Sequence, residues 1–128
     1  MAAAAPQRPV DVEMAKFQTL QTEIQELVGQ QQQYNQQANE NGMVQSELKL
    51  CQEDAKVFKL VGPVLLKQDV EDAKNNVNKR LEFIKNESDK VAKKLSRKQA
   101  EAAELRQKIG EMQASMKQAA AEAAKAVV

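Results

Sequence analysis

Apolar residues recur at alternating intervals of three and four through the second half of this chain. A period of 3.5 residues sustained over about seven heptads places these side chains in one stripe of a helix and specifies a supercoil with a second helix. We therefore expect one arm of a long coiled coil rather than a helix of a globular bundle. Thirteen of the fifteen stripe positions are apolar: Val77, Leu81, Ile84, Ser88, Val91, Leu95, Lys98, Ala102, Leu105, Ile109, Met112, Met116, Ala119, Ala123 and Ala126.

A weaker heptad repeat runs through the first half of the chain. The repeat fades at the glutamines of residues 30–33 and again around Gly42. At Gly42 we expect a local bend of the helix or a change of heptad register. Because both flanks of the glutamine run keep the heptad, we expect helix there rather than a low-complexity loop. Eight of its twelve positions are apolar: Val10, Glu13, Phe17, Leu20, Ile24, Leu27, Gln31, Tyr34, Ala38, Asn41, Gln45 and Leu48.

Between the two repeats, helical spacing gives way to a strand-like composition. Val57–Val61 and Val64–Leu66 are rich in apolar and β-branched residues, and Gly62-Pro63 between them is a turn signal. Glycine suits the positive φ needed at the first position of a two-residue turn, and the fixed φ of proline suits the second. We expect a β-hairpin with two largely apolar faces. One face carries Val57, Lys59, Val61, Val64, Leu66 and Gln68, and the other carries Phe58, Leu60, Leu65 and Lys67.

Opposite net charges favour pairing of the two repeats within one chain. Residues 10–50 hold six acids and two bases, a net charge of −4, whereas residues 70–128 hold nine acids and thirteen bases, a net charge of +4. We therefore expect a mainly α fold, a long antiparallel two-helix coiled coil joined by a single β-hairpin. The expected bounds are a disordered N-terminus at 1–9, a domain at 10–118 with helices at about 10–52 and 69–118 around a hairpin at about 56–68, and an Ala-rich tail at 119–128.

The composition excludes most catalytic and metal chemistry. The chain has no histidine and one cysteine, Cys51, so the usual nucleophile–base pairs and metal-ligand clusters cannot be built. We expect no catalytic residue, no cofactor and no metal. A single cysteine cannot form an internal disulfide, which is typical of a reducing compartment. The sequence shows no apolar run of signal-peptide or membrane-spanning type, so we expect a soluble cytoplasmic protein.

The densest basic cluster lies in the second repeat. It comprises Lys90, Lys93, Lys94, Arg97 and Lys98, and it contains no aromatic side chain. This composition fits a solvated helix face opposite the acidic repeat better than it fits a nucleic-acid patch. The net charge of +1 for the whole chain also gives no bias toward nucleic acid or acidic membranes, and we expect neither partner.

The predicted hairpin requires a partner, because a lone two-stranded hairpin is marginally stable in water and its outer backbone groups form open edges. Packing onto its own helices would supply one, and so would assembly with other chains. Two apolar faces favour assembly, with either face as the interior of the interface. The candidate assembly residues are Val57, Phe58, Leu60, Val61, Gly62, Pro63, Val64, Leu65 and Leu66.

The hairpin sequence Phe58–Gln68 closely resembles the hairpin motif of β-class prefoldin subunits. The flanks, Val44–Leu48 before the hairpin and Ala73 with Val77–Ile84 after it, are most similar to the eukaryotic subunit 6 branch of that family. The resemblance covers about residues 10–116. The hairpin and the lysine-arginine-leucine sequence of the second flank are its most specific parts.

The resemblance implies a heterohexamer of two α-class and four β-class subunits, whose hairpins assemble into a platform of β-barrels from which coiled-coil arms project. The implied partners are the other prefoldin subunits, two α-class and three further β-class. They also include unfolded clients such as actin and tubulin, and the cytosolic chaperonin, to which the complex itself passes clients without using ATP.

The resemblance also places client contact at the far end of the coiled coil. Helix ends fray, so seam side chains become available there, and methionine adapts to irregular surfaces. The same side chains can instead pack against one another, and the competing function is a structural coiled-coil scaffold of a prefoldin-like assembly that holds no client. The candidate client-binding residues are Val10, Met14, Phe17, Leu20, Leu105, Ile109, Met112 and Met116.

Overall fold

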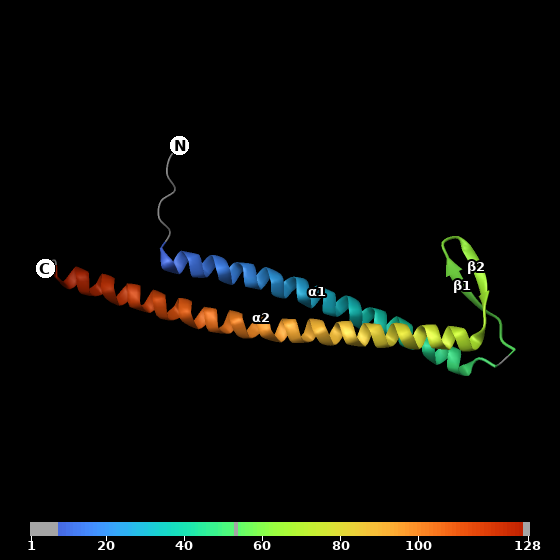
Figure 1. Cartoon of the computed structure of the whole chain (residues 1–128). Helices are drawn as coiled ribbons and strands as arrows, with labels where there is room; N and C mark the ends of the chain where they lie inside the picture. Colours follow the sequence, from blue (N-terminus) through green and yellow to red (C-terminus); the bar gives the residue numbers. More distant parts are fainter. Residues whose placement is uncertain (1–7, 53, 127–128) are drawn as a thin grey trace. The chain divides into compact units, whose positions relative to one another are not determined.

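A computed structural model describes residues 8–52 and 54–126. In this part of the chain the elements follow the order α1 (Pro9–Leu50), β1 (Val57–Val61), β2 (Val64–Gln68) and α2 (Val70–Ala126). The helices contain 42 and 57 residues. The predicted order of helix, hairpin and helix is therefore confirmed (Figure 1).

The chain divides into two compact units, which we describe separately. The hairpin unit is Gly29–Ala92, and the helix-end unit combines Met1–Val28 with Lys93–Val128. Within each unit, a segment of α1 lies beside a segment of α2 that runs in the opposite direction (Figure 1). Each unit therefore contains an antiparallel helix pair, and the hairpin unit also carries β1 and β2.

Both helices begin at residues whose chemistry suits a helix N-terminus. Pro9 is the first residue of α1, where the missing N–H of proline is tolerated because no intrahelical acceptor exists for it. The carbonyl of Arg8 accepts a hydrogen bond from the backbone N–H of Asp11 at 2.9 Å. At α2 the carbonyl of Asp69 accepts one from Ala73 at 2.9 Å. Two acidic residues, Glu71 and Asp72, occupy the first turn of α2, where the helix dipole favours negative charge.

The first helix ends about where expected, and the second does not. α1 ends at Leu50, close to the expected end near residue 52. α2 continues to Ala126, past the end expected near residue 118. Residues 119–126 are mostly alanine, the best helix former, so this segment propagates the helix instead of forming a separate tail. Of the N-terminal segment expected to be disordered, residues 1–7 lie outside the described residues and Pro9 is helical.

α1 is continuous through both weak points of its heptad repeat, the glutamines of residues 30–33 and Gly42. A local bend or a change of register was expected at Gly42, and of these two the change of register is not found. Asn41, Gln45 and Leu48 keep the original spacing, and all three are buried or half-buried. One glycine in a helix interior costs only about 1 kcal/mol relative to alanine, so the seam packing on both sides can hold the helix in register.

The seam positions predicted from the two repeats are the covered ones. All twelve positions in α1 and the eleven positions of α2 from Val77 to Met112 are buried or half-buried. The last four positions of α2, from Met116 to Ala126, are exposed. In the helix-end unit Met116 shares a groove with Val10 at the start of α1. The residues of α2 after Met116 therefore extend past the beginning of their partner helix.

A small core in the hairpin unit joins the two helices to the hairpin. Leu48 of α1 packs with Ala73 and Val77 of α2, and each of these side chains is 6% exposed or less. Cys51, Val57 and Leu81 pack against this cluster. Because Val57 begins β1, the hairpin is anchored on the helix pair through its first strand residue.

A side-chain hydrogen bond connects the helices next to this core. The Nε2 of Gln45 donates to the Oδ1 of Asn78 at 2.8 Å. Gln45 is one of the polar seam positions of α1, and a paired polar side chain in a seam favours one register over its neighbours. The polar residues that weaken the heptad pattern therefore contribute to the specificity of helix pairing here.

Candidate functional site

β1 and β2 pair in antiparallel fashion with a two-residue turn. Gly62 has a φ of +59°, and the ring of Pro63 restricts its own φ to negative values. Of the two common hairpin turns, only type II′ accepts this combination. Directly opposite residues share a face of the sheet, so the two predicted faces are confirmed. The Cα partners are Val57 with Gln68, Phe58 with Lys67, Lys59 with Leu66, Leu60 with Leu65, and Val61 with Val64.

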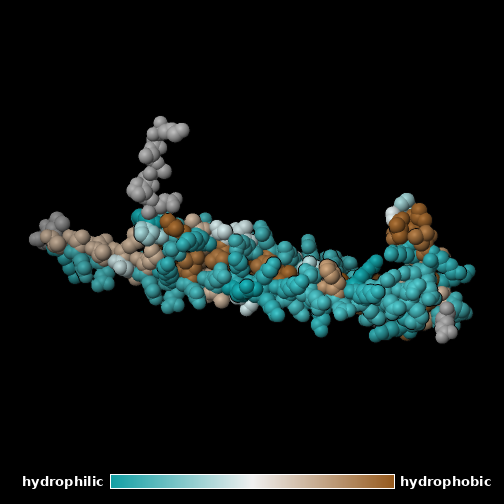
Figure 2. All heavy atoms as spheres, viewed as in Figure 1, coloured by the Kyte–Doolittle hydropathy of each residue, from teal (hydrophilic) through white to brown (hydrophobic). Residues whose placement is uncertain are grey.

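Large apolar side chains are exposed on both faces of the hairpin. Their exposed fractions range from 48% at Val61 to 68% at Leu60. Figure 2 shows the hairpin as a mostly hydrophobic surface. Covering one side chain of this size completely contributes about 1.5–3 kcal/mol, so covering the whole set would contribute several kcal/mol to an assembly. The set comprises Phe58, Leu60, Val61, Val64, Leu65 and Leu66.

Both strands of the hairpin are edge strands, because β1 and β2 are the only strands of this sheet among the described residues. Each strand therefore presents a row of outward backbone N–H and C=O groups to which another strand can bind. Lys59 and Lys67 place one charged side chain on each face. Charged residues of this kind discourage indiscriminate edge pairing, so the hairpin suits a specific partner.

The structure brings the nine predicted assembly residues together in the hairpin, but they are not equally available. Val57 is half-buried because it packs on the core of the helix pair. Gly62 and Pro63 form the exposed turn, and the six remaining residues are the exposed apolar set described above. Their part in assembly stays a prediction.

The eight predicted client-binding residues all lie in the helix-end unit, and the partner helix covers most of them. The structure therefore shows the mutual packing that the sequence left open as an alternative. Two methionines remain at the surface, Met14 with 44% and Met116 with 40% exposed. The covered residues are Val10, which is 3% exposed, and Phe17, Leu20, Leu105, Ile109 and Met112, which are half-buried.

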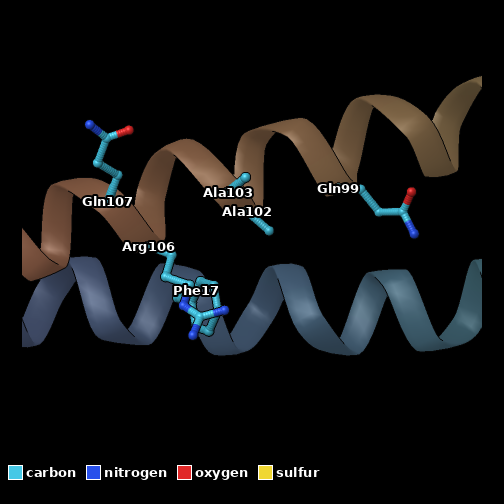
Figure 3. Close-up of a pocket in the computed structure, with 6 residues that line it drawn as sticks. All are labelled: Phe17, Gln99, Ala102, Ala103, Arg106 and Gln107. Atoms are coloured by element: carbon cyan, nitrogen blue, oxygen red, sulfur yellow. The ribbon is translucent and has the colours of Figure 1, made fainter.

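A surface groove of about 560 Å³ lies beside Phe17 in this unit. Its lining is apolar at Phe17 and two alanines and polar at two glutamines and one arginine. Figure 3 shows Arg106 extending from α2 toward Phe17, whereas Gln107 points away from α1. A lining of this kind suits a peptide segment with both apolar and polar groups. The lining residues are Phe17 of α1 and Gln99, Ala102, Ala103, Arg106 and Gln107 of α2.

A second groove of the helix-end unit, about 380 Å³ in volume, lies where α1 begins. It contains three of the predicted client-binding residues, two of them methionines. The polar residues of both grooves were missed from the sequence because they flank the apolar seam instead of occupying it. The lining residues are Pro9, Val10, Lys108, Glu111, Met112, Ser115 and Met116.

Ion pairs connect the two helices of this unit. The Nζ of Lys98 lies 2.8 Å from the Oε2 of Glu23, and the Nζ of Lys108 lies 3.5 Å from the Oε1 of Glu13. The hydrogen bond and the negative charge of Glu23 raise the pKa of Lys98. Each pair joins a base of α2 to an acid of α1, as the predicted charge complementarity requires. Lys98, a member of the basic cluster, therefore faces the acidic helix.

One exposed aromatic residue of the hairpin unit was missed from the sequence. Phe83 of α2 is 61% exposed and lies outside the heptad seam. It lines a groove of about 350 Å³. An aromatic residue outside the seam stripe of a coiled coil is the signal that could have identified this surface. The other lining residues are Gln37, Asn41, Lys79, Arg80 and Ile84.

Three further observations concern other kinds of site. Cys51 is half-buried, and its thiol donates a hydrogen bond to the carbonyl of Glu47 at 3.4 Å.

Within residues 8–52 and 54–126 no cluster of three or more histidine, cysteine, aspartate or glutamate side chains is arranged to hold a metal ion. In the same residues neither helix combines the length and the apolar content needed to cross a membrane.

The sequence matches the family model described as prefoldin subunit over residues 12–116, which is most of the chain. The chain belongs to the prefoldin subunit family. It is 39% identical to the probable prefoldin subunit 6 of Caenorhabditis elegans, over 88% of this chain and 92% of the relative. It is 32% identical to prefoldin subunit 6 of Homo sapiens, over 90% of this chain and 89% of the relative. The predicted resemblance to prefoldin, and to its subunit 6 branch, is confirmed.

The fold is also that of a solved prefoldin subunit. The crystal structure of the prefoldin beta subunit from Thermococcus strain KS-1 matches with a TM-score of 0.76 over 88% of this chain and 96% of that one. The sequence identity of 20% limits this likeness to the fold. The prefoldin family match ends at residue 116, so residues 117–126 of α2 extend past it.

Proposed function

We propose that this prefoldin subunit assembles through its hairpin into a heterohexamer of two α-class and four β-class subunits. The observation that supports the proposal is the set of six exposed apolar side chains on a hairpin with two open edges. A β-barrel platform would pair both strand edges and cover one apolar face, because a closed barrel has no edge strands. The hairpin residues Phe58–Leu66 then form the assembly surface.

The helix-end unit binds unfolded proteins, with clients such as actin and tubulin, and the complex passes them to the cytosolic chaperonin. Support comes from two exposed methionines, Met14 and Met116, and from two grooves with partly apolar linings. Methionine is flexible and polarizable, which suits a surface that accepts many sequences. In this proposal the subunit is a cytoplasmic chaperone component that acts without catalysis, cofactor, nucleic acid or membrane.

Native mass spectrometry tests the assembly proposal. The complex is purified through a tag on this chain expressed in its own cells, and its mass and subunit composition are measured. We expect a hexamer that contains this chain together with other prefoldin subunits. A monomer, or an oligomer of this chain alone, would contradict the proposal.

A structural scaffold without client binding is the second candidate function. The burial of Val10 and the partial burial of five other predicted client-binding residues favour it, because a covered seam offers little apolar surface. Aggregation of chemically unfolded actin, followed by light scattering, discriminates between the two functions. We expect the assembled complex to suppress aggregation, whereas a scaffold would leave the aggregation rate as it is in buffer.

A further inference from the structure

The Phe83 groove, lined by the six residues named above, is a surface that neither the hairpin nor the helix ends account for. Phe83 is 61% exposed, more than the 52% of Phe58 on the hairpin. Ile84 beside it is buried in the seam and forms the floor. An exposed aromatic ring next to an apolar floor is typical of the central contact of a protein interface, where aromatic and arginine side chains are enriched.

The charges around the Phe83 groove are positive. Lys79 and Arg80 line it, and no carboxylate does. Neither base forms an ion pair with a described residue. On a helix, Lys79 and Arg80 lie four and three residues before Phe83, so all three side chains share one face. The surface therefore complements a segment that presents an apolar side chain and a carboxylate about one helical turn apart.

The Phe83 groove and the surface beneath the hairpin share one lining residue, Arg80. Arg80 also lines a cleft of about 280 Å³ whose other walls include Val57, Phe58 and Leu60. Both surfaces belong to the hairpin unit. A chain that pairs with the hairpin thus approaches the side of α2 that carries Arg80.

We propose that the Phe83 groove receives an acidic helix from an adjacent prefoldin subunit, whose apolar side chain packs on Phe83 and whose carboxylate pairs with Arg80 or Lys79. The proposal rests on hairpin-mediated assembly and adds a second, charged contact to it. A guanidinium–carboxylate pair is specific in geometry as well as strong, so this contact would help to select the neighbour in a complex of unlike subunits.

Two variants and two matched controls test the proposal in complexes formed by co-expression with the other subunits. Phe83→Ser removes the ring, and Arg80→Glu reverses the charge. Met43→Ser replaces an apolar side chain by serine, and Lys85→Glu reverses a positive charge, at exposed positions that line neither this groove nor the cleft beneath the hairpin. Mass photometry of serial dilutions gives the concentration at which half of the hexamer has dissociated, and circular dichroism checks that helix content is unchanged.

We expect the groove variants to raise the half-dissociation concentration about tenfold, the scale of losing one anchoring contact, and the controls to leave it within about twofold. Arg80→Glu should also flatten the dependence of dissociation on salt, because an ion pair is screened and an apolar contact is not. Hexamers of both groove variants that dissociate like wild type would overturn the proposal. Leu60→Asp, measured in parallel, tests hairpin assembly itself, so failure of the groove and failure of the platform are told apart.

A photo-crosslinker identifies the occupant directly. With p-benzoylphenylalanine at position 83 of the assembled complex, we expect a crosslink to a helical peptide of another subunit that contains an aspartate or glutamate. Crosslinking to denatured actin added as client, with none to a subunit, would assign the groove to client binding and overturn the proposal. The absence of any crosslink in intact hexamer would overturn it as well.

Discussion

The hairpin and the helix-end unit differ in how far their apolar side chains are exposed. The hairpin displays apolar side chains on two faces, and nothing else in the described chain covers them. The helix ends place apolar side chains in two stripes that largely cover each other. An uncovered apolar surface with open strand edges requires a lasting partner, whereas a mutually covered one can bind a partner transiently at its margins. The difference is what we expect if, as proposed, the hairpin serves assembly and the helix ends serve client binding.

Packing density separates the two units as well. Of the eleven seam positions in the hairpin unit, four are buried: Leu48, Val77, Ile84 and Val91, each 6% exposed. In the helix-end unit only Val10 and Leu95 of the seam are buried, and the other seam residues, Leu105 among them, are half-buried or exposed. The seam is therefore more tightly packed in the unit that carries the assembly surface, which would fix the position of the hairpin while the helix ends fray.

The largest effect on hexamer formation is expected from a charged residue introduced into the apolar surface of the hairpin. Leu60→Asp or Phe58→Asp should abolish hexamer formation and leave helix content nearly unchanged, because an unpaired charge buried in an interface costs several kcal/mol. Leu50→Asp is the control, since Leu50 is 79% exposed at the end of α1, outside the hairpin. Sedimentation velocity measures the outcome, and an intact hexamer with both hairpin variants would move the interface elsewhere.

A smaller effect, a partial loss of the suppression of client aggregation, is expected from shortening the helix ends. Deletion of residues 1–17 together with 110–128 should spare the hexamer and weaken the suppression of actin aggregation. The loss stays partial because the other arms of a hexamer still bind, and multivalency masks a defect in one arm. Deletion of residues 118–128 alone is the control, because it leaves both grooves intact. If suppression is unchanged when every β-class arm is shortened, the client site is not at the helix ends.

The difference in packing predicts unequal effects of one substitution in the two units. Leu48→Ala should lower the free energy of unfolding by about 2–4 kcal/mol, in the range measured for buried leucines. Leu105→Ala should lower it by roughly 1 kcal/mol, because a half-buried side chain loses fewer contacts and leaves no closed cavity. Urea denaturation followed by circular dichroism measures both values. Equal losses would show that the two seams are packed alike.

The smallest effect concerns the exposed ion pairs of the helix-end unit. Pairing with Glu23 raises the pKa of Lys98. The pair therefore stabilises the fold fully at pH values below the ordinary lysine pKa. This stabilisation is lost as the pH rises through the raised pKa. The hydrogen bond from Arg8 lowers the pKa of Asp11, so that pairing stabilises above the ordinary aspartate pKa and is lost as pH falls through the lowered value. Both effects are small, because solvent screens exposed pairs.

Thermal unfolding of wild type and Lys98→Gln across alkaline pH tests the predicted pH dependence of the Lys98–Glu23 pair. We expect the wild type to be slightly more stable at neutral pH and the two melting temperatures to converge as Lys98 loses its proton. A difference in melting temperature that persists at high pH would show that Lys98 stabilises through packing of its aliphatic stem.

The heptad repeats and the hairpin were predictable from the sequence, because each depends on local rules. A 3.5-residue period specifies a seam, and Gly62 followed by Pro63 specifies a turn. The predicted end of α2 near residue 118 is wrong, because the alanine-rich segment after it propagates the helix. The predicted change of register at Gly42 is not found, because packing at Leu48 and its neighbours outweighs the cost of one glycine.

The candidate surfaces were predictable in part. The hairpin faces follow from strand alternation, so its exposed set could be identified. At the helix ends, the sequence identified the seam residues but could not decide how far each is covered, because coverage depends on where α1 begins relative to α2. The Phe83 groove was missed because it combines residues of two helices that are about forty positions apart in the chain and share no motif.

Hydrogen exchange of this chain in three states, alone, in the assembled complex, and in the complex with unfolded actin, tests the proposed division of labour most directly. The account predicts that amides of residues 57–68 gain protection on assembly and do not change when actin is added. It predicts that amides near the helix ends, at residues 9–20 and 105–116, gain protection only with actin. Protection by actin within the hairpin, or protection on assembly confined to the helix ends, would contradict the account.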